Sequence, residues 1–302
     1  MTMGAPEVSV IIVNYNTLPL TAACIDSVLD MTEDLSFEVI LVDNASTDGS
    51  REAFSRRTDI TYIYSEENLG FGRANNLGYA SSKGRYIFLL NSDTLLKNNA
   101  VKQLHDYLAD APAEVGCVGC LLQDVEGHPI HSFGDFPTVR STWRQTVASY
   151  FKCLQRPHNM PLPTDTYPKE VDYITGADLM IRRSVIEQYG LFNPAFFMYW
   201  EETELQRRYA RHGIRRMVIE GPQIVHLVGA SIGKQSQSLR SLCMSTESYY
   251  TYLRLACPRK ERIALALLNL SIIPRLLCGR SPWADKKKLS SLILRKTAAA
   301  LA

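Results

Sequence analysis

The first hundred residues alternate between short apolar runs and segments with helical spacing. One such segment carries Leu20, Ala23, Cys24 and Val28 on one helical face. Strands separated by helices of about ten to fifteen residues indicate βαβ units and a parallel sheet. We therefore predict an α/β fold, with a mostly parallel central sheet flanked by helices. The predicted strands are Val8–Val13, Phe37–Val42, Ile60–Tyr64 and Tyr86–Leu90.

The pattern loosens after residue 116. Residues 121–170 contain several prolines and few clear periods, which predicts long loops. Regular structure returns downstream, and the chain from about residue 247 is helical in pattern. We expect one α/β domain over residues 1–246, with halves of 1–120 and 121–246, followed by a helical C-terminal segment over 247–302. The downstream elements predicted are strands at Tyr173–Arg182 and Arg216–Ile219 and helices at Ser184–Tyr189 and Glu201–His212.

Charge is distributed unevenly along the 302 residues. The net charge is +2, but the stretch from Arg254 onward carries eleven Lys and Arg against two acidic residues. A basic tail on an acidic body suggests an anionic partner. Aromatic residues are almost absent after Tyr252, which argues against nucleic acid. Two alternatives stay open: an interfacial helix on an anionic membrane surface, with Leu265, Leu268, Ile272 and Leu276 on one face, or a helical cap packed on the main domain.

The N-terminus has no basic segment of a signal peptide, and no apolar run reaches the ~18 residues of a membrane-spanning helix. Seven scattered cysteines fit a reducing compartment. We interpret Cys117 and Cys120, a lone C-x-x-C pair, as strand packing rather than a metal or redox site. The expectation is a cytoplasmic protein, with a peripheral position on the inner face of the cytoplasmic membrane as the option that the basic tail leaves open.

Polar residues close each predicted strand. They are Asn14–Asn16, Asp43–Asn44, Asn68–Asn76 and Asn91–Asp93. In a parallel sheet the carboxyl ends gather at one edge, where ligands bind. Asp93 could hold a divalent cation against a phosphate, or it could cap a helix beginning near Asn98. Asp43 could likewise accept hydrogen bonds from a ribose or base, or cap the next helix.

A glycine-containing turn, Gly70-Phe-Gly72, invites a dinucleotide-binding interpretation. That interpretation is weak because the third glycine of the motif is replaced by Asn75 and the turn follows the third strand. A Rossmann oxidoreductase is therefore disfavoured. The turn is better interpreted as one that approaches a phosphate or a base, because glycine permits close backbone contact.

A second acidic group, Glu201, Glu202 and Glu204, follows an aromatic run. Carboxylates at a helix N-terminus are favoured by the helix dipole, but a carboxylate beside aromatic rings can also act as a general base. His226 closes a short strand-like run. It is either a packed residue or a metal ligand that pairs with Asp93.

Seven motifs in order carry a family resemblance: SVIIVNYN (9–16), VDNASTDGS (42–50), ENLGFGRANNLG (67–78), LLNSDT (89–94), TGADLMIRRSVIEQYGLFN (175–193), FFMYWEETELQRR (196–208) and IVHLVGAS (224–231). The chain resembles the family 2 glycosyltransferases, in particular the bacterial rhamnosyltransferase-like branch. The resemblance spans residues 8–231 and implies the GT-A fold, with a nucleotide-binding half and an acceptor-side half.

The resemblance implies a set of donor-binding residues at the nucleotide edge: Asn14, Asn16, Asp43, Asn75, Asn91 and Asp93. Asp93 matches the last acid of the family's D-x-D metal motif, whose first acid is replaced here by Asn91. His226 matches a histidine that can ligate the metal in related enzymes. The implied cofactor is a divalent cation, Mg²⁺ or Mn²⁺.

On the acceptor side, the resemblance places Gly176, Ala177, Asp178 and Trp200 near the acceptor, with Asp178 standing where a small or apolar residue is usual. Glu202 matches the aspartate of the family's E-D pair and is the candidate base, with Glu201 and Glu204 as alternatives. The implied activity is inverting transfer of a sugar from a dTDP-, UDP- or GDP-linked donor to a glycan or a lipid-linked acceptor, as in surface polysaccharide synthesis. A nucleotide-sugar-binding protein without turnover is the alternative.

Overall fold

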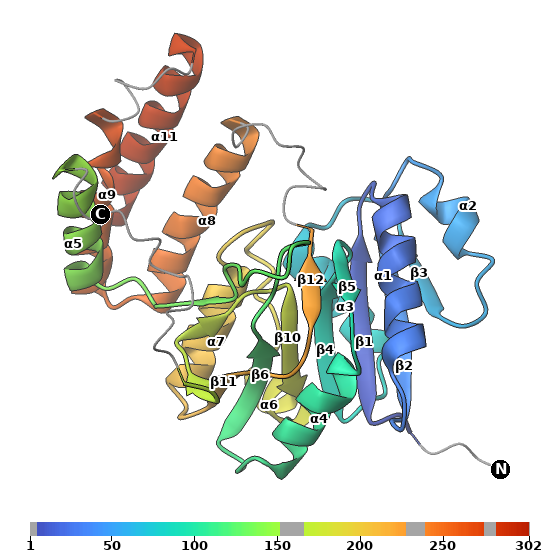
Figure 1. The fold of residues 1–302 in the computed structure, drawn as a ribbon. Helices are drawn as coiled ribbons and strands as arrows, with labels where there is room; N and C mark the ends of the chain where they lie inside the picture. Colours follow the sequence, from blue (N-terminus) through green and yellow to red (C-terminus); the bar gives the residue numbers. More distant parts are fainter. Residues whose placement is uncertain (1–4, 152–165, 228–238, 275–281, 302) are drawn as a thin grey trace.

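The computed structural model describes residues 5–151, 166–227, 239–274 and 282–301 (Figure 1). Its first half follows the predicted alternation of strands and helices. Each predicted strand is present and one or two residues longer or shifted at its ends. The elements are β1 (Val8–Asn14), α1 (Leu18–Met31), β2 (Phe37–Asn44), α2 (Ser50–Phe54), β3 (Thr61–Ser65), α3 (Phe71–Ser81), β4 (Tyr86–Asn91), β5 (Thr94–Leu96), α4 (Ala100–Asp110) and β6 (Val115–Cys120).

The second half departs from prediction in two places. The region predicted as long loops contains a helix of 13 residues, and the strand predicted over Tyr173–Arg182 is two strands separated by a turn. The other predicted helices and strands are found within two residues of their expected bounds. The elements are β7 (Phe133–Gly134), α5 (Val139–Phe151), β8 (Lys169–Glu170), β9 (Tyr173–Ile174), β10 (Asp178–Arg182), α6 (Arg183–Tyr189), α7 (Glu201–Ala210), β11 (Arg215–Ile219), β12 (Ile224–His226), α8 (Leu239–Ala256), α9 (Arg259–Asn269) and α11 (Trp283–Leu301).

The central sheet has eight strands in the order β3-β2-β1-β4-β10-β6-β11-β8. The first four strands pair in parallel, so their carboxyl ends meet at one edge. β10 runs antiparallel to both β4 and β6. β4 is therefore buried as expected, but it is parallel to its neighbour on one side only. The reversed strand brings the turn at Thr175–Ala177 to the same edge as the end of β4, where Asn91 N donates to Ala177 O.

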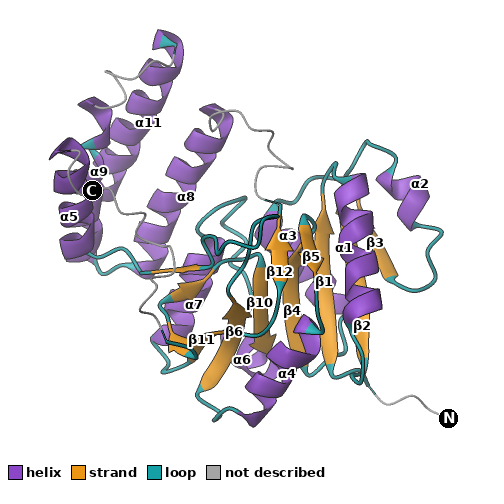
Figure 2. Cartoon of the chain, in the orientation of Figure 1, coloured by secondary structure: helices purple, strands orange, loops and turns teal. Residues whose placement is uncertain are grey.

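Side chains that alternate along each strand divide the core into two layers. Val10 and Ile12 pack on the side covered by α1 and α4, whereas Ile11 packs on the side of α3, α6 and α7. Figure 2 shows these helices on the two faces of the sheet. Parallel strands covered on both faces are nearly continuous apolar runs, because neither face meets water. This explains why the strands could be found from the sequence.

The C-terminal helices α8, α9 and α11 pack together beside α7, and α5 from the middle of the chain packs with them (Figure 1). These four helices, α5, α8, α9 and α11, are called the helical group below. The predicted boundary at residues 246/247 falls inside α8, which begins at Leu239. The division into two domains stays a prediction. A shortened protein that lacks the C-terminal segment should therefore end before Leu239, so that α8 is not cut.

The face predicted for a membrane helix is not continuous. α9 ends at Asn269, and Leu265 is fully buried within the helical group. Leu276 and the basic residues Arg275 and Arg280 lie outside the described residues, as do positions 228–231 of the last family motif. Within the described ranges, no helix combines the length and apolar character needed to cross a membrane.

Candidate active site

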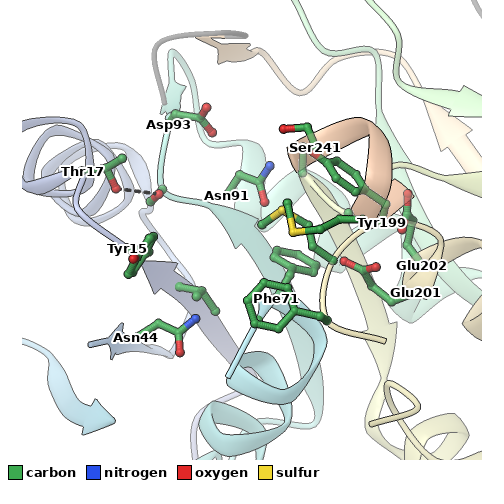
Figure 3. Close-up of a pocket in the computed structure, with 18 of the residues that line it drawn as sticks. Tyr15, Thr17, Asn44, Phe71, Asn91, Asp93, Tyr199, Glu201, Glu202 and Ser241 are labelled. Carbon is green, nitrogen blue, oxygen red and sulfur yellow. Dashed lines mark hydrogen bonds between the residues drawn. The ribbon is translucent and has the colours of Figure 1, made fainter. Parts of the chain in front are cut away.

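A cavity of about 680 Å³ opens at the carboxyl edge of the parallel strands, between that edge and the loop that leads into α7 (Figure 3). Seven residues expected at the site line it: Asn91, Asp93, Gly176, Ala177, Glu201, Glu202 and His226. Residues from the two distant acidic motifs therefore surround one space.

Asp93 and His226 form a close pair at one end of the cavity. Asp93 Oδ1 lies 3.2 Å from His226 Nε2, and both side chains are largely buried. The short antiparallel pair β5–β12 sets this distance, since His226 pairs with Thr94 and Leu227 N donates to Asp93 O. The helix-cap alternative for Asp93 is wrong, because the next helix begins at Ala100 with Asn99 at its N-cap.

A carboxylate oxygen next to an imidazole nitrogen is a donor set that suits Mn²⁺ and related divalent cations. Asn91 and Ser92 line the same part of the cavity and bring further oxygen atoms there. The side chains at this end therefore fit a divalent cation. A separate acidic group, Asp124, Glu126 and His128, lies on a turn whose N–H groups donate to Asp124 itself, and none of its members lines the cavity.

Glu201 and Glu202 begin α7 on the opposite wall of the cavity (Figure 3). Glu201 is 3% exposed, and its Oε2 has no hydrogen-bond partner within the described part of the chain. Burial, together with the negative charge of Glu202, raises the pKa of Glu201 to about 8. Burial also raises the pKa of Glu202. A carboxyl pair of this kind holds a proton near neutral pH, because two adjacent charges cannot both ionise easily.

Glu204 does not line the cavity. Its carboxylate accepts from Arg208, one helical turn later, at 3.3 Å. Arg208 in turn donates to the backbone carbonyls of Tyr189, Gly190 and Leu191. This geometry makes Glu204 part of the link between α7 and the end of α6, and leaves Glu201 and Glu202 as the two glutamates of this group that line the cavity.

Several residues expected to contact a donor are instead bonded to one another. Asn14 is fully buried and accepts from the hydroxyls of Thr17 and Thr21, both at 2.9 Å. Asp43 is also fully buried and accepts from Tyr62 Oη at 2.8 Å and Ser46 N at 3.1 Å. Neither side chain lines the cavity. These residues therefore shape the sheet edge from behind.

Asn16 and Asn75 also lie away from the cavity lining. Asn16 is exposed and accepts from Thr47 N at 2.7 Å, and Asn75 donates to Phe71 O within its own helix at 3.0 Å. The neighbours of the expected residues line the cavity instead. Tyr15, next to Asn14, is 49% exposed there, and Asn44 stands where Asp43 was expected.

Two residues expected on the acceptor side face other parts of the molecule. Asp178 is fully buried, and its Oδ2 accepts from Cys120 N at 2.6 Å. Burial raises the pKa of Asp178 to about 8. Trp200 packs against Tyr249 and Tyr252 of α8, with ring centroids 4.9 and 5.2 Å apart. Neither side chain lines the cavity, so a direct contact with an acceptor is not supported by their positions.

The glycine turn before α3 lies close to another part of the protein, the loop that leads into α7. Gly70 has a φ of +79°, and a Cβ there would lie 2.0 Å from Phe197 O. This space lets Phe71 N donate to Phe197 O at 2.9 Å. The turn therefore ties α3 to the loop that carries Glu201 and Glu202.

Lining residues that the sequence did not indicate include Thr17, Tyr199, Arg240, Ser241 and Met244. Asn68 and Phe71 also line the cavity, and both fall within Asn68–Asn76, one of the groups expected at the sheet edge. Arg240, Ser241 and Met244 come from α8, and no pattern in the sequence linked this helix to the strand ends.

Comparison with known proteins gives consistent matches. The chain is 28% identical over 214 residues to a low-salt glycan biosynthesis hexosyltransferase from Haloferax volcanii, covering 69% of this chain and 63% of that protein. It is 26% identical over 244 residues to the N-acetylglucosaminyl-diphospho-decaprenol L-rhamnosyltransferase of Mycobacterium tuberculosis, covering 74% and 77%. The match to the archaeal relative thus spans less than two thirds of that protein.

Two solved structures share the fold. A mannosyltransferase from Pyrobaculum calidifontis in complex with GDP-Man and Mn²⁺ superposes with a TM-score of 0.53 at 19% identity, covering 99% of this chain and 74% of that one. GalNAc-T7 with UDP, GalNAc and Mn²⁺ superposes with a TM-score of 0.59 at 15% identity, covering 97% and 55%. These likenesses confirm the predicted GT-A fold.

The sequence model described as glycosyl transferase family 2 matches residues 9–190, more than half of the chain. The matched region contains strands β1 to β4, the glycine turn and Asp93, which together form one side of the cavity. The chain belongs to the family 2 glycosyltransferases.

Proposed function

We propose that this protein transfers a sugar, with inversion, from a nucleotide-diphosphate donor to a hydroxyl of a glycan or lipid-linked acceptor. The observation that carries the proposal is the arrangement around one cavity: the Asp93–His226 pair at one end and the Glu201–Glu202 pair on the opposite wall. Family membership and relatives named as hexosyl- and rhamnosyltransferases support it. Rhamnose on dTDP is our first choice of donor, with UDP- and GDP-linked sugars as alternatives.

We assign Asp93 and His226 to a divalent cation, Mg²⁺ or Mn²⁺, with Asn91 beside them. A bound cation would offset the negative charge that develops on the departing diphosphate. The fit of the donor set supports this assignment, as does the Mn²⁺ in the two structural neighbours. The protein holds the carboxylate of Asp93 and the imidazole of His226 together at one end of the cavity.

Glu202 is our candidate base, with Glu201 as the alternative. The acceptor hydroxyl gives its proton to a carboxylate oxygen while its own oxygen attacks the anomeric carbon. The bond from that carbon to the diphosphate breaks on the opposite face, and the anomeric configuration inverts. Burial, together with the repulsion between the two carboxylates, raises the pKa of the pair, so the pair holds a proton near neutral pH while its other carboxylate can act as the base.

The proposal is tested by screening nucleotide sugars for Mn²⁺-dependent thermal stabilisation, followed by a transfer and donor-hydrolysis assay with the donors that bind. We expect one donor class to stabilise the protein and to yield nucleotide diphosphate and a product of inverted configuration. Binding without hydrolysis or transfer under any acceptor condition would favour the nucleotide-sugar-binding alternative. Binding of no nucleotide sugar would contradict the proposal.

We also propose a peripheral position on the cytoplasmic face of an anionic membrane. Large apolar side chains are exposed on the helical group, including Trp143, Leu267, Ile272, Trp283 and Leu294. Exposed basic residues lie on the same α11 as Trp283, among them Lys287 and Lys288. Apolar side chains next to basic ones suit the interface of an anionic bilayer.

Flotation with anionic and neutral vesicles tests the membrane proposal. Full-length protein is expected to float with anionic vesicles, and the double substitution of Lys287 and Lys288 by Gln should weaken this. Each basic residue near the surface is worth about 1 kcal/mol, so the loss should be about tenfold or more in partitioning. Equal binding by the two proteins, or none by either, would contradict it.

A further inference from the structure

The loop before α7 has an unusual backbone. Tyr199 and Trp200 both have positive φ values, 72° and 68°, and neither is glycine. Bulky residues rarely adopt this conformation, and it persists only when the surrounding structure enforces it. Glu201 and Glu202 follow directly. The direction in which these two carboxylates leave the backbone is therefore set by a strained pair.

Helix α8 holds this loop from one side. Ser248 Oγ donates to Met198 O at 2.7 Å, and the ring of Trp200 lies against Tyr249 and Tyr252. Phe196, at the start of the loop, is 1% exposed within the apolar cluster of α8 and α9. The loop residues thus belong to the core of the C-terminal helices as much as to the sheet domain.

The glycine turn holds the loop from the other side. Phe71 N donates to Phe197 O at 2.9 Å, and only glycine fits at position 70 next to that carbonyl. Contacts from α3 and α8 to successive carbonyls, at Phe197 and Met198, leave the peptide planes before Tyr199 little freedom. The strained pair lies just after this clamped segment.

The far end of α7 is tied to the same helices. Arg207 donates to Tyr252 Oη at 2.7 Å and to both carboxylate oxygens of Glu261 in α9 at 3.0 Å. Both contacts with Glu261 come from Nη2, so this end of the guanidinium is held against the carboxylate while Nη1 bonds to Tyr252. Tyr252 therefore contacts α7 at two places, through its ring at Trp200 and through its hydroxyl at Arg207.

We propose that Ser248, Tyr249 and Tyr252 of α8 are positioning residues that hold the Tyr199–Trp200 pair, and through it the carboxylates of Glu201 and Glu202, in the geometry needed for transfer. The inference rests on the proposed function for its kinetic consequence. It assigns the C-terminal helices a direct part in the active site, and it makes α8 the element through which events on the helical group reach the glutamates.

The test compares Ser248→Ala with Thr251→Ala, a matched control on the same helix. Among the described residues, the hydrogen bond of Thr251 Oγ1 goes to Glu247 O within α8, whereas the Ser248 hydroxyl donates to Met198 O in the loop. We expect Ser248→Ala to lower kcat at least ~10-fold, because a small misplacement of a catalytic group is costly, while the donor KM stays within about twofold. Thr251→Ala should leave both values unchanged.

Tyr249 supplies a second pair of variants. Tyr249→Leu removes the ring that packs on Trp200 and should lower kcat in the same way. Tyr249→Phe keeps the ring, so its kcat should stay near the wild-type value. If the substitutions instead destabilised the whole fold, kcat and the melting temperature would fall in both variants. A split between kcat and KM, with rescue by Phe, is expected only of a positioning role.

Hydrogen exchange gives a readout that does not depend on turnover. Amides of residues 198–204 should exchange at least ~10-fold faster in Ser248→Ala than in wild type or Thr251→Ala, since opening of this segment becomes easier. Unchanged exchange together with unchanged kcat would overturn the inference. If exchange rises but the wild type transfers no sugar, the positioning stands and the proposed function fails.

Discussion

The polar residues behind the sheet edge and those at the start of α7 differ in how their hydrogen bonds are satisfied. Asn14 and Asp43, behind the sheet edge, are fully buried and bonded to neighbouring hydroxyl and amide groups. At the start of α7, Glu201 is buried, its Oε2 lacks a hydrogen-bond partner among the described residues, and its pKa is raised to about 8. The first region is stabilised by its own hydrogen bonds, whereas the second holds a carboxyl whose burial destabilises the fold.

A buried carboxyl without a partner destabilises the fold, so its persistence indicates that something other than stability retains it. The same reasoning does not apply to Asn14, whose bonds stabilise the edge. We therefore expect substitutions of Asn14 and Asp43, which lie behind the sheet edge, to act first on folding, and substitutions of residues that line the cavity to act first on chemistry.

Asp93→Asn should have the largest effect. Loss of the carboxylate charge weakens cation binding and stabilisation of the departing diphosphate, so kcat/KM should fall at least ~10²-fold. Mn²⁺-dependent thermal stabilisation by the donor should disappear with it. Asp124→Asn, in the exposed acidic group, is the control and should stay near wild type. Wild-type turnover of Asp93→Asn in Mn²⁺ would remove the metal assignment.

Asn14→Ala should chiefly affect stability. The substitution leaves the buried hydroxyls of Thr17 and Thr21 without their acceptor, so the free energy of unfolding should fall by at least ~2 kcal/mol. Tyr15→Ala, at an exposed position that lines the cavity, should leave stability nearly unchanged and raise the donor KM. Denaturant unfolding and steady-state kinetics of both variants measure the contrast. If Asn14→Ala changed only the donor KM and Tyr15→Ala changed only the stability, our distinction between the residues behind the sheet edge and those that line the cavity would be wrong.

Glu201→Gln should alter the pH profile rather than the rate at pH 7. In the wild type, Glu201 loses its proton as the pH rises through about 8, which adds a second negative charge to the wall that faces the negatively charged donor. The rate should therefore fall above that pH. Glutamine stays neutral, so the fall should be absent in Glu201→Gln and present in Glu204→Gln, whose side chain faces Arg208. Identical profiles in both variants would reject this account.

Asp178→Asn should show the smallest effect on sugar transfer, because Asp178 does not line the cavity, and should change mainly the pH dependence of stability. Burial raises the pKa of Asp178 from 3.8 to about 8. Because the folded protein keeps this proton when the unfolded chain has lost it, the stability should fall as the pH rises from about 4 to 8. The Asn variant should lack this part of the slope in unfolding experiments. An unchanged slope would show that Asp178 is ionised in the folded protein.

Most of the sheet and the cavity's acidic residues could be predicted from the sequence. Buried strands are apolar runs, and their ends carry the polar residues that meet at one edge. The direction of β10 could not be predicted, because the apolar pattern of a strand is the same in either orientation. The choice between Asp43 and Asn44 also failed, since β2 continues to Asn44 and successive side chains point to opposite faces.

Helix α5 was missed although a local signal existed. Thr138 and Ser141 bond reciprocally at the helix start, with Thr138 N donating to Ser141 Oγ and Ser141 N to Thr138 Oγ1. This is the pattern of a capping box. The prolines around it favoured a loop prediction, and the packing of α5 beside α9 is a tertiary contact that no local pattern reveals.

The most direct test of the central claim is single-turnover transfer by Glu202→Gln with saturating donor and Mn²⁺. We predict that the variant binds the donor as tightly as the wild type but transfers the sugar at least ~10²-fold more slowly, because the acceptor hydroxyl has lost its base. Transfer at the wild-type rate would contradict the claim that the carboxylates of α7 act on a donor held by Asp93 and His226.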